Sequence, residues 1–480
     1  MVDGPDATLD PEDWKDIRAI GHRMLDDMFD HLEGIRARPV WQQMPAEARD
    51  SLRAPLPRAP GSLEEAYRTL QDSVIPYTVG NPHPGFMGWV HGAGTPVGML
   101  AEMIAGGLNA NVGGRNQAPV EVEHQVSTWM ASLFGFPANA RGVFVTGTSI
   151  ANFMGVVVAR TAALGRDVRE QGLAAHAGLR AYASVEAHGC IAKAMDMAGF
   201  GTDALRSVRV DAAGRMDLIE LAAQVAADRA NGLRPFLVVA SAGTVNTGAI
   251  DPLAALADFA REHAMWLHVD GAYGALGMLA PDVAPLLGGI ERADSIAFDF
   301  HKWGQVPYDA GYFMARDGDR MLDAFAAPAS YLQRAGRGLA AGTAWPCDVG
   351  PDLSRGFRAL KTWLTFQVYG ADAIGRSISA TCALARRLAE RIAAEPELEL
   401  AAPVTLNVVC FRYVCDDERR IEHINREIVL TLYDEGRVAP SATTLGGHYA
   451  IRAAIVNHRT GQADIDALVD AVLAAGRRLS

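Results

Sequence analysis

The chain has little of what marks a disulfide-stabilised, zinc-binding or membrane-spanning protein. Its cysteines are few and irregularly spaced, at positions 190, 347, 382, 410 and 415, so neither a disulfide framework nor a metal site is expected. Its apolar runs are broken well short of the roughly 20 residues that cross a bilayer. The acidic start, "MVDGPDATLDPEDW", lacks the basic and apolar regions of a secretion signal. We therefore expect a cytoplasmic protein without a membrane partner.

Concentrated positive charge is also missing. The net charge is -12 and the pI is about 5.6, and no basic patch stands out, so nucleic acid is not expected as a partner. The phosphate-binding pattern G-x-x-x-x-G-K-[ST] is absent, and no G-x-G-x-x-G opens the first strand–helix turn. Nucleotide hydrolysis and dinucleotide-dependent dehydrogenation are therefore disfavoured.

What is present is an ordinary globular composition, with 49% hydrophobic and 21% charged residues. Apolar spacing predicts a helix over 9–36, followed by a Pro- and Arg-rich arm. From about 143 to 315, short apolar runs alternate with amphipathic segments, which predicts a mainly parallel α/β sheet with ligands at the carboxyl ends of its strands. We expect an N-terminal arm at 1–80, a large domain at 81–355 and a small α+β domain at 356–480.

Three polar groups at predicted strand ends indicate a cofactor site. Gly147, Thr148 and Ser149, in "VTGTSIAN", lie between a strand and a helix, where free N–H groups suit a phosphate, although an ordinary helix cap is the alternative. Asp270 ends the strand "MWLHV", where a buried carboxylate needs a cation or strong donor. Lys302, in "DFHKWGQ", follows 32 residues later, enough for one helical crossover between neighbouring parallel strands.

Taken singly, Asp270 suits a helix cap or structural ion pair, and Lys302 a solvated surface position. Together with a phosphate site, they match the anchors of pyridoxal 5'-phosphate: a lysine for the Schiff base, an aspartate for the ring nitrogen and an anion site. His188, in "SVEAHGC", could stack on the ring or be an ordinary loop histidine. Thr244, in "SAGTVNTGAIDP", could bond the phenolic oxygen or the Asp270 carboxylate, or shape a turn.

The chain resembles the group II pyridoxal-phosphate-dependent amino acid decarboxylases, which include aromatic L-amino acid and glutamate decarboxylases. The resemblance rests on ordered motifs that span nearly the whole chain: "NPHPGFMGW", "GTSIANFMGVVVAR", "EAHGCIAKA", "AGTVNTGAIDP", "HVDGAYG", "DFHKW" and "LSRGFRALKTW". It implies the fold-type I transferase-like architecture, with a seven-stranded large domain, and a homodimer with a shared active site. It also implies decarboxylation of an L-amino acid to an amine and carbon dioxide through a quinonoid intermediate. Phe86 and Trp89 suit an apolar or aromatic substrate, although ordinary core positions are the alternative.

The resemblance assigns a role to each candidate residue. Lys302 would hold the cofactor, Asp270 would pair with the ring nitrogen, and His188 and Ala272 would cover the two faces of the ring. The phosphate region would comprise Gly147, Thr148, Ser149 and His301. His83 falls where relatives line the substrate pocket, and Arg452, in "YAIRAAI", falls where related enzymes often bind a carboxylate.

Three departures from the family pattern bear on the reaction. Asp299 and Val245 stand where relatives commonly have asparagine and threonine. In relatives, a loop matching 326–352 carries a tyrosine that reprotonates Cα, but here Tyr331 precedes that place, Trp345 falls near it, and no tyrosine lies between 332 and 368. Oxidative deamination to an aldehyde therefore stays open, as do a lyase of the sphingosine-phosphate type and a non-catalytic binding protein.

Overall fold

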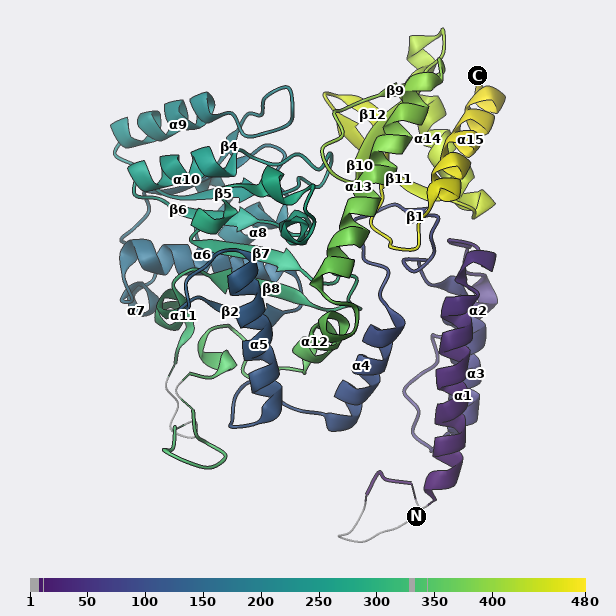
Figure 1. Cartoon of the computed structure of the whole chain (residues 1–480), viewed down its shortest axis with the longest axis horizontal. Helices are drawn as coiled ribbons and strands as arrows, with labels where there is room; N and C mark the ends of the chain where they lie inside the picture. The colour runs from purple at the N-terminus through teal and green to yellow at the C-terminus, as the bar shows by residue number, and fades with distance from the viewer. Residues whose placement is uncertain (1–7, 12, 328–332, 343) are drawn as a thin grey trace.

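The computed structural model describes residues 8–11, 13–327, 333–342 and 344–480. Its larger β-sheet has seven strands in the order β2-β8-β7-β6-β5-β3-β4 (Figure 1). These strands are β2 (Arg141–Val145), β3 (Leu179–Ser184), β4 (Leu205–Val208), β5 (Arg234–Ser241), β6 (Trp266–Asp270), β7 (Ser295–Asp299) and β8 (Gly311–Ala315). Neighbouring strands pair in parallel except β8, which is antiparallel to β2 and β7. The expected mainly parallel, seven-stranded sheet is confirmed.

Both faces of this sheet are covered by helices because its strands are apolar on both sides. On β5, Leu237 and Val239 face one cluster of buried side chains, whereas Val238 and Ala240 face the other. The first cluster includes α6 (Thr148–Leu164), α8 (Cys190–Met197) and α11 (Gly318–Phe325); the second includes α5 (Ala118–Leu133), α9 (Leu218–Ala230), α10 (Leu253–Glu262) and α12 (Arg358–Tyr369). A short helix, α7 (Val168–Gln171), follows α6. Side chains therefore alternate between the two faces, as strand geometry requires.

The link from β6 to β7 differs from the expectation. The two strands are parallel neighbours, with Asp270 opposite Ala297, as the spacing of Asp270 and Lys302 predicted. The segment between them forms three 3₁₀-helices, at Gly274–Leu279, Ala284–Leu287 and Ile290–Arg292, and not the expected α-helical crossover. Its glycines and prolines, in "GALGMLAPDVAPLLGG", explain why no longer helix forms.

A second sheet has five strands in the order β1-β11-β12-β10-β9. They are β1 (Phe86–Met87), β9 (Leu398–Leu400), β10 (Val408–Tyr413), β11 (Ala439–Leu445) and β12 (His448–Ala454). Helices α13 (Ala371–Ala394), α14 (Glu418–Glu435) and α15 (Gln462–Leu479) complete its apolar core. This unit is the expected small C-terminal α+β domain.

Two segments cross the predicted domain boundaries. Phe86 pairs in parallel with Ala439, so β1, expected in the large domain, is a strand of the small sheet. Helix α12, expected in the small domain, packs against α4 (Pro96–Leu108) and α5. Strand pairing and helix packing between residues far apart in the sequence decide both placements, and neither is visible in local sequence patterns.

The N-terminal arm comprises α1 (Trp14–Glu33), α2 (Ala46–Ser51) and α3 (Leu63–Ser73), which stand beside the rest of the chain (Figure 1). Helix α1 starts at its cap, Asp13, whose carboxylate accepts the Lys15 N–H. None of its residues is buried, and Tyr67 of α3 donates a hydrogen bond to Asp27 at 2.7 Å. Within the described ranges, no helix is both long enough and apolar enough to span a membrane.

Candidate active site

A cavity of about 390 Å³ opens at the carboxyl ends of the central strands. The residues after β2, β3, β5, β6 and β7 all contribute to its wall, which is the place where parallel α/β sheets bind ligands. Most of the residues singled out in the sequence line it: Gly147, Thr148, Ser149, His188, Thr244, Asp270, Ala272, His301, Lys302 and Arg452. The expected gathering of strand-end polar groups is therefore present.

His83 is the exception. It is buried, but it is not part of the cavity wall. Its Nδ1 accepts a hydrogen bond from the Gly85 N–H at 2.9 Å, and its carbonyl accepts one from Asn457. The ring thus closes a local turn, and the structure does not bring His83 to the other candidates.

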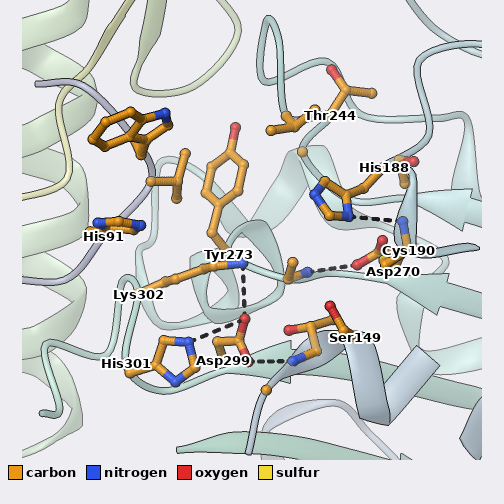
Figure 2. Close-up of a pocket in the computed structure, with 18 of the residues that line it drawn as sticks. His91, Ser149, His188, Cys190, Thr244, Asp270, Tyr273, Asp299, His301 and Lys302 are labelled. Atoms are coloured by element: carbon orange, nitrogen blue, oxygen red, sulfur yellow. Dashed lines mark hydrogen bonds and ion pairs between the residues drawn. The ribbon is translucent and has the colours of Figure 1, made fainter. Parts of the chain in front are cut away.

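Lys302 lies in the turn that follows β7, with its ammonium group against Asp299 (Figure 2). The distance from Lys302 Nζ to Asp299 Oδ2 is 2.9 Å. His301 Nε2 lies 3.6 Å from the same oxygen, and His301 Nδ1 accepts the Ala310 N–H at 3.0 Å. Burial lowers the pKa of His301 to about 4, so the ring is neutral near neutral pH, with its proton on Nε2.

Asp270 has no ion pair among the described residues. It is 5% exposed, and its Oδ1 accepts the Ala272 N–H at 3.2 Å. Burial raises the pKa of Asp270, while the nearby Lys302 and His188 side chains oppose that rise. A buried carboxylate that faces a cavity in this way suits a protonated ring nitrogen.

The first turn of α6 lies at the cavity, where the anion site was expected. Gly147 is the residue before the helix, and the Thr148 N–H donates to Asp299 Oδ1 at 2.8 Å. The Thr148 hydroxyl is buried and has no hydrogen-bond partner in the described part of the chain. Gly311 of β8 allows this close approach, because a Cβ there would lie 2.3 Å from the Gly147 backbone. An unpaired buried hydroxyl beside a helix N-terminus fits a phosphate ligand.

His188 and Thr244 have local hydrogen bonds as well as cavity positions. His188 Nδ1 accepts the Cys190 N–H at 3.2 Å, so a ring proton lies on the other nitrogen, Nε2. The Thr244 hydroxyl accepts the Ala249 N–H at 3.1 Å and lies 3.1 Å from the Thr247 hydroxyl. Thr244 therefore also shapes its turn, one of the alternatives that the sequence left open.

Arg452 lines the cavity, and its guanidinium already donates hydrogen bonds to other groups of the protein. It donates to the carbonyls of Val245, Asn246 and Gly88 and to the Ser441 hydroxyl, at distances from 2.6 to 3.2 Å. These contacts tie the turn after β5 to the small sheet. Binding of a substrate carboxylate by Arg452 stays a prediction, and it would compete with these bonds.

Several residues of the cavity wall were not predicted from the sequence. His91, Tyr273 and Tyr308 line the cavity, and the Tyr308 ring lies 4.2 Å from the His301 ring between centroids. Nothing in the spacing of His91 or Tyr308 marks them, because their segments lack a strand–helix pattern. Tyr273 could have been found from its place in "HVDGAYG", three residues after Asp270.

Near the loop position where relatives are expected to carry a tyrosine lies a buried tryptophan. Trp345 is 3% exposed, its indole N–H donates to the Ala341 carbonyl, and the Arg334 guanidinium lies 3.5 Å from its ring centroid. Trp345 does not line the cavity. Tyr331 lies outside the described residues.

Comparison with known proteins identifies the family. The model of the pyridoxal-dependent decarboxylase conserved domain matches residues 45–414. The chain belongs to this family. The aromatic-L-amino-acid decarboxylase of Bacillus atrophaeus is 31% identical over 454 residues, covering 93% of this chain and 92% of that protein. The phenylacetaldehyde synthase of Arabidopsis thaliana is 29% identical over 469 residues, covering 95% of this chain and 94% of its own.

A solved structure agrees over nearly the whole chain. The crystal structure of Oryza sativa TDC with PLP and tryptamine superposes with a TM-score of 0.90 at 26% identity, covering 98% of this chain and 100% of that one. The fold-type I architecture is confirmed, and the enzyme is a pyridoxal-phosphate-dependent amino acid decarboxylase, a carboxy-lyase. The unpaired Thr148 hydroxyl and the Asp270 carboxylate fit the phosphate and ring nitrogen of that cofactor. No cluster of three or more metal-binding side chains occurs within the described ranges.

Proposed function

We propose that the enzyme decarboxylates an aromatic L-amino acid. The observation that carries this proposal is the aromatic wall of the cavity opposite the strand ends. The Trp89 and His91 rings lie 5.9 Å apart, and the Tyr308 ring stands edge-on to His91 at 5.7 Å. Aromatic side chains favour an aromatic ligand through stacking and apolar burial.

The charged side chains of the cavity wall also favour an aromatic substrate over an acidic one. Among the described residues that line the cavity, Lys302 and Arg452 are the only lysine and arginine. Lys302 is needed for the cofactor, and the Arg452 guanidinium already donates to four groups. An acidic side chain, such as that of glutamate, would find no free cation on this described wall and would lose its hydration without compensation.

We propose the following roles for the wall residues. Lys302 binds the cofactor covalently, Asp270 keeps the ring nitrogen protonated, and His188 and Ala272 cover the faces of the ring. Gly147, Thr148, Ser149 and His301 surround the phosphate, and Thr244 bonds the phenolic oxygen. When bound, pyridoxal phosphate supplies an electron sink for the pair of electrons released as the carboxylate leaves. The protein orients the scissile bond and excludes water.

We also propose that the enzyme works as a cytoplasmic homodimer with a shared active site. Helix α1 leaves Trp14 59% and Ile17 40% exposed, and α4 leaves Met103 56% and Leu108 59% exposed. Apolar surface of this extent on two helices suits burial against a second copy of the chain.

A second candidate function is decarboxylation coupled to oxidative deamination, which yields an aldehyde. Two observations favour it. No tyrosine lies between 332 and 368, and Trp345, near the place where the loop tyrosine was expected, is buried and does not line the cavity. One relative is a phenylacetaldehyde synthase. Without that phenol, a different group must protonate Cα.

One screen tests both candidates. The purified enzyme is incubated with each common L-amino acid in air, and carbon dioxide, amine, aldehyde, ammonia and peroxide are measured in the same samples. The proposal expects carbon dioxide and amine in equal amounts, with the highest rates for phenylalanine, tyrosine or tryptophan. Equal amounts of aldehyde and ammonia with peroxide would establish the second candidate, and a preference for an acidic substrate would contradict the first. A Lys302→Ala sample controls for contaminating activity.

A further inference from the structure

The imidazole ring of His91 lies in the cavity wall beside Lys302 (Figure 2). The residue that follows it ties this segment to the turn that carries the lysine, because the Gly92 N–H donates to the His301 carbonyl at 3.0 Å. The two backbones are so close that a Cβ on Gly92 would lie 2.5 Å from the Lys302 carbonyl oxygen. His91 is therefore held at a fixed place next to the lysine.

The hydrogen bond of the His91 ring determines which of its nitrogens carries a proton. Nδ1 lies 3.1 Å from Asn81 Oδ1, and because an amide oxygen can only accept, Nδ1 is the donor. Burial and the charge of Lys302 lower the pKa of His91, so the ring is neutral near neutral pH. Nε2 then has a lone pair and no proton.

The lone pair of His91 Nε2 is open to the cavity. Nε2 has no hydrogen-bond partner among the residues that the structure describes, and it is not one of their buried unpaired atoms. The Phe86 ring lies nearly parallel to the imidazole, at 5.9 Å between centroids, and the Tyr308 ring stands edge-on to it at 5.7 Å. Nε2 is thus a hydrogen-bond acceptor set in an aromatic surface.

We propose that His91 Nε2 accepts a hydrogen bond from the side chain of the substrate, and that the preferred substrates are aromatic amino acids with such a donor. The donor is the phenolic O–H of tyrosine or the indole N–H of tryptophan. The proposal rests on the aromatic substrate proposed above. An amino acid reacts at the cofactor atom that Lys302 binds, so a wall group beside the lysine lies near the substrate. Phenylalanine would leave the acceptor unpaired, and a site of this kind selects against such a ligand.

Isosteric substrate pairs test the acceptor in the wild-type enzyme. 4-Methylphenylalanine has a methyl group in place of the tyrosine hydroxyl, and 3-benzothienylalanine has sulfur in place of the tryptophan N–H. We expect kcat/KM to be about tenfold higher for the natural member of at least one pair, as for one hydrogen bond whose acceptor is otherwise left unpaired. The pair that shows this difference identifies the donor. Equal values within both pairs would overturn the proposal.

A variant assigns the preference to His91. His91→Phe keeps an aromatic ring and removes the acceptor, so it should lower kcat/KM for the preferred amino acid by about tenfold without a comparable fall for its analogue. His448→Phe is the matched control, because His448 is exposed at the start of β12 and does not line the cavity; it should keep the wild-type ratio. A wild-type ratio in His91→Phe would overturn the proposal, because another group would then bind the donor.

A measurement without substrate separates this proposal from the proposed function. Nitrogen-15 labelling of histidine in the wild-type protein reports the tautomer of His91, assigned by the signals that His91→Phe lacks. We expect the proton on Nδ1, and a proton on Nε2 would overturn the proposal whatever the substrate is. If aromatic amino acids are decarboxylated without a preference in either pair, the role of His91 alone is wrong. If no aromatic amino acid is decarboxylated, the proposed function is wrong as well.

Discussion

Lys302 Nζ lies 2.9 Å from Asp299 Oδ2, and Oδ1 of the same carboxylate accepts the Thr148 N–H at 2.8 Å. One buried carboxylate thus contacts both the lysine proposed to bind the cofactor aldehyde and the helix terminus proposed to bind its phosphate. The Lys302 side chain must leave this ion pair before its nitrogen can attack an aldehyde, and a phosphate at the helix terminus would lie beside the negative charge of Asp299. Asp299 therefore opposes both steps of cofactor binding.

Replacing Asp299 with asparagine should speed cofactor attachment. The amide oxygen can still accept the Thr148 N–H, but Lys302 loses its negative partner and the phosphate loses a negative neighbour. We expect faster appearance of the bound cofactor's absorbance after mixing, and a lower dissociation constant, both by about tenfold. Stopped-flow absorbance measures the rate and equilibrium titration the affinity.

Asp309→Asn is the matched control for this change. Asp309 pairs with Arg358 at 2.9 Å and contacts neither Lys302 nor Thr148, so it should leave the attachment rate unchanged. An unchanged attachment rate in Asp299→Asn would show that the carboxylate does not oppose binding, and a slower rate would show that it assists binding.

Thr148→Val should have opposite effects on stability and on cofactor binding. The hydroxyl is buried without a partner among the described residues, which costs about 1–3 kcal/mol, so the isosteric valine should raise the thermal midpoint of the protein measured without added cofactor. The same change removes a phosphate donor and should weaken cofactor binding by about tenfold. Tighter or unchanged binding in a correctly folded variant would remove Thr148 from the phosphate site.

The Arg355 and Glu123 pair should be essential to the large domain. Both side chains are nearly fully buried and form a two-point ion pair at 2.6 and 3.0 Å, and Arg355 also donates to the Phe144 carbonyl. Arg355→Met leaves the Glu123 charge unpaired, so we expect a loss of about 3–5 kcal/mol in the free energy of unfolding. Adding Glu123→Gln to this variant should recover part of the lost free energy of unfolding, which urea denaturation measures. If nothing is recovered, the unpaired Glu123 charge is not the cause of the loss.

Burial of His268 should make the enzyme less stable in acid. The folded state keeps this ring neutral down to pH about 3, whereas the unfolded chain protonates it near pH 6.5. The neutral His268 ring contributes fully to the free energy of unfolding above pH 6.5, and this contribution is lost as the pH falls toward 3. At about pH 5 the loss amounts to about 2 kcal/mol. The fall in unfolding free energy between neutral pH and pH 5 should be smaller by that amount in His268→Gln. The control variant His22→Gln, at an exposed position on α1, should show the same fall in unfolding free energy as the wild type.

The sequence was sufficient for the parts of the site that lie on regular elements. Asp270 and Lys302 could be paired from their spacing alone because each ends or follows an apolar strand, and parallel strands deliver such residues to one edge of a sheet. The position of Thr148 at the same cavity could be predicted for the same reason. Family resemblance then supplied Ala272 and His301, which carry no pattern of their own.

The features of the site that could not be predicted from the sequence depend on contacts between segments far apart in the chain. The partner of Lys302 is Asp299, which stands out in the sequence only as a departure from relatives, and the resemblance places His83 at the wall although its ring serves a local turn. The Asn152–His268 contact joins residues 116 positions apart. Apolar spacing carries no information about such pairings, because both residues read as interruptions of a buried helix or strand.

The most direct test of the role proposed for Lys302 is to locate the residue that binds the cofactor. The loaded enzyme is reduced with borohydride, digested and analysed by mass spectrometry. The chain contains only four lysines, at positions 15, 193, 302 and 361, so the assignment is unambiguous. We expect the reduced cofactor on the peptide containing Lys302, and no label or activity in Lys302→Ala. Label on Lys15, Lys193 or Lys361, or full activity in Lys302→Ala, would contradict it.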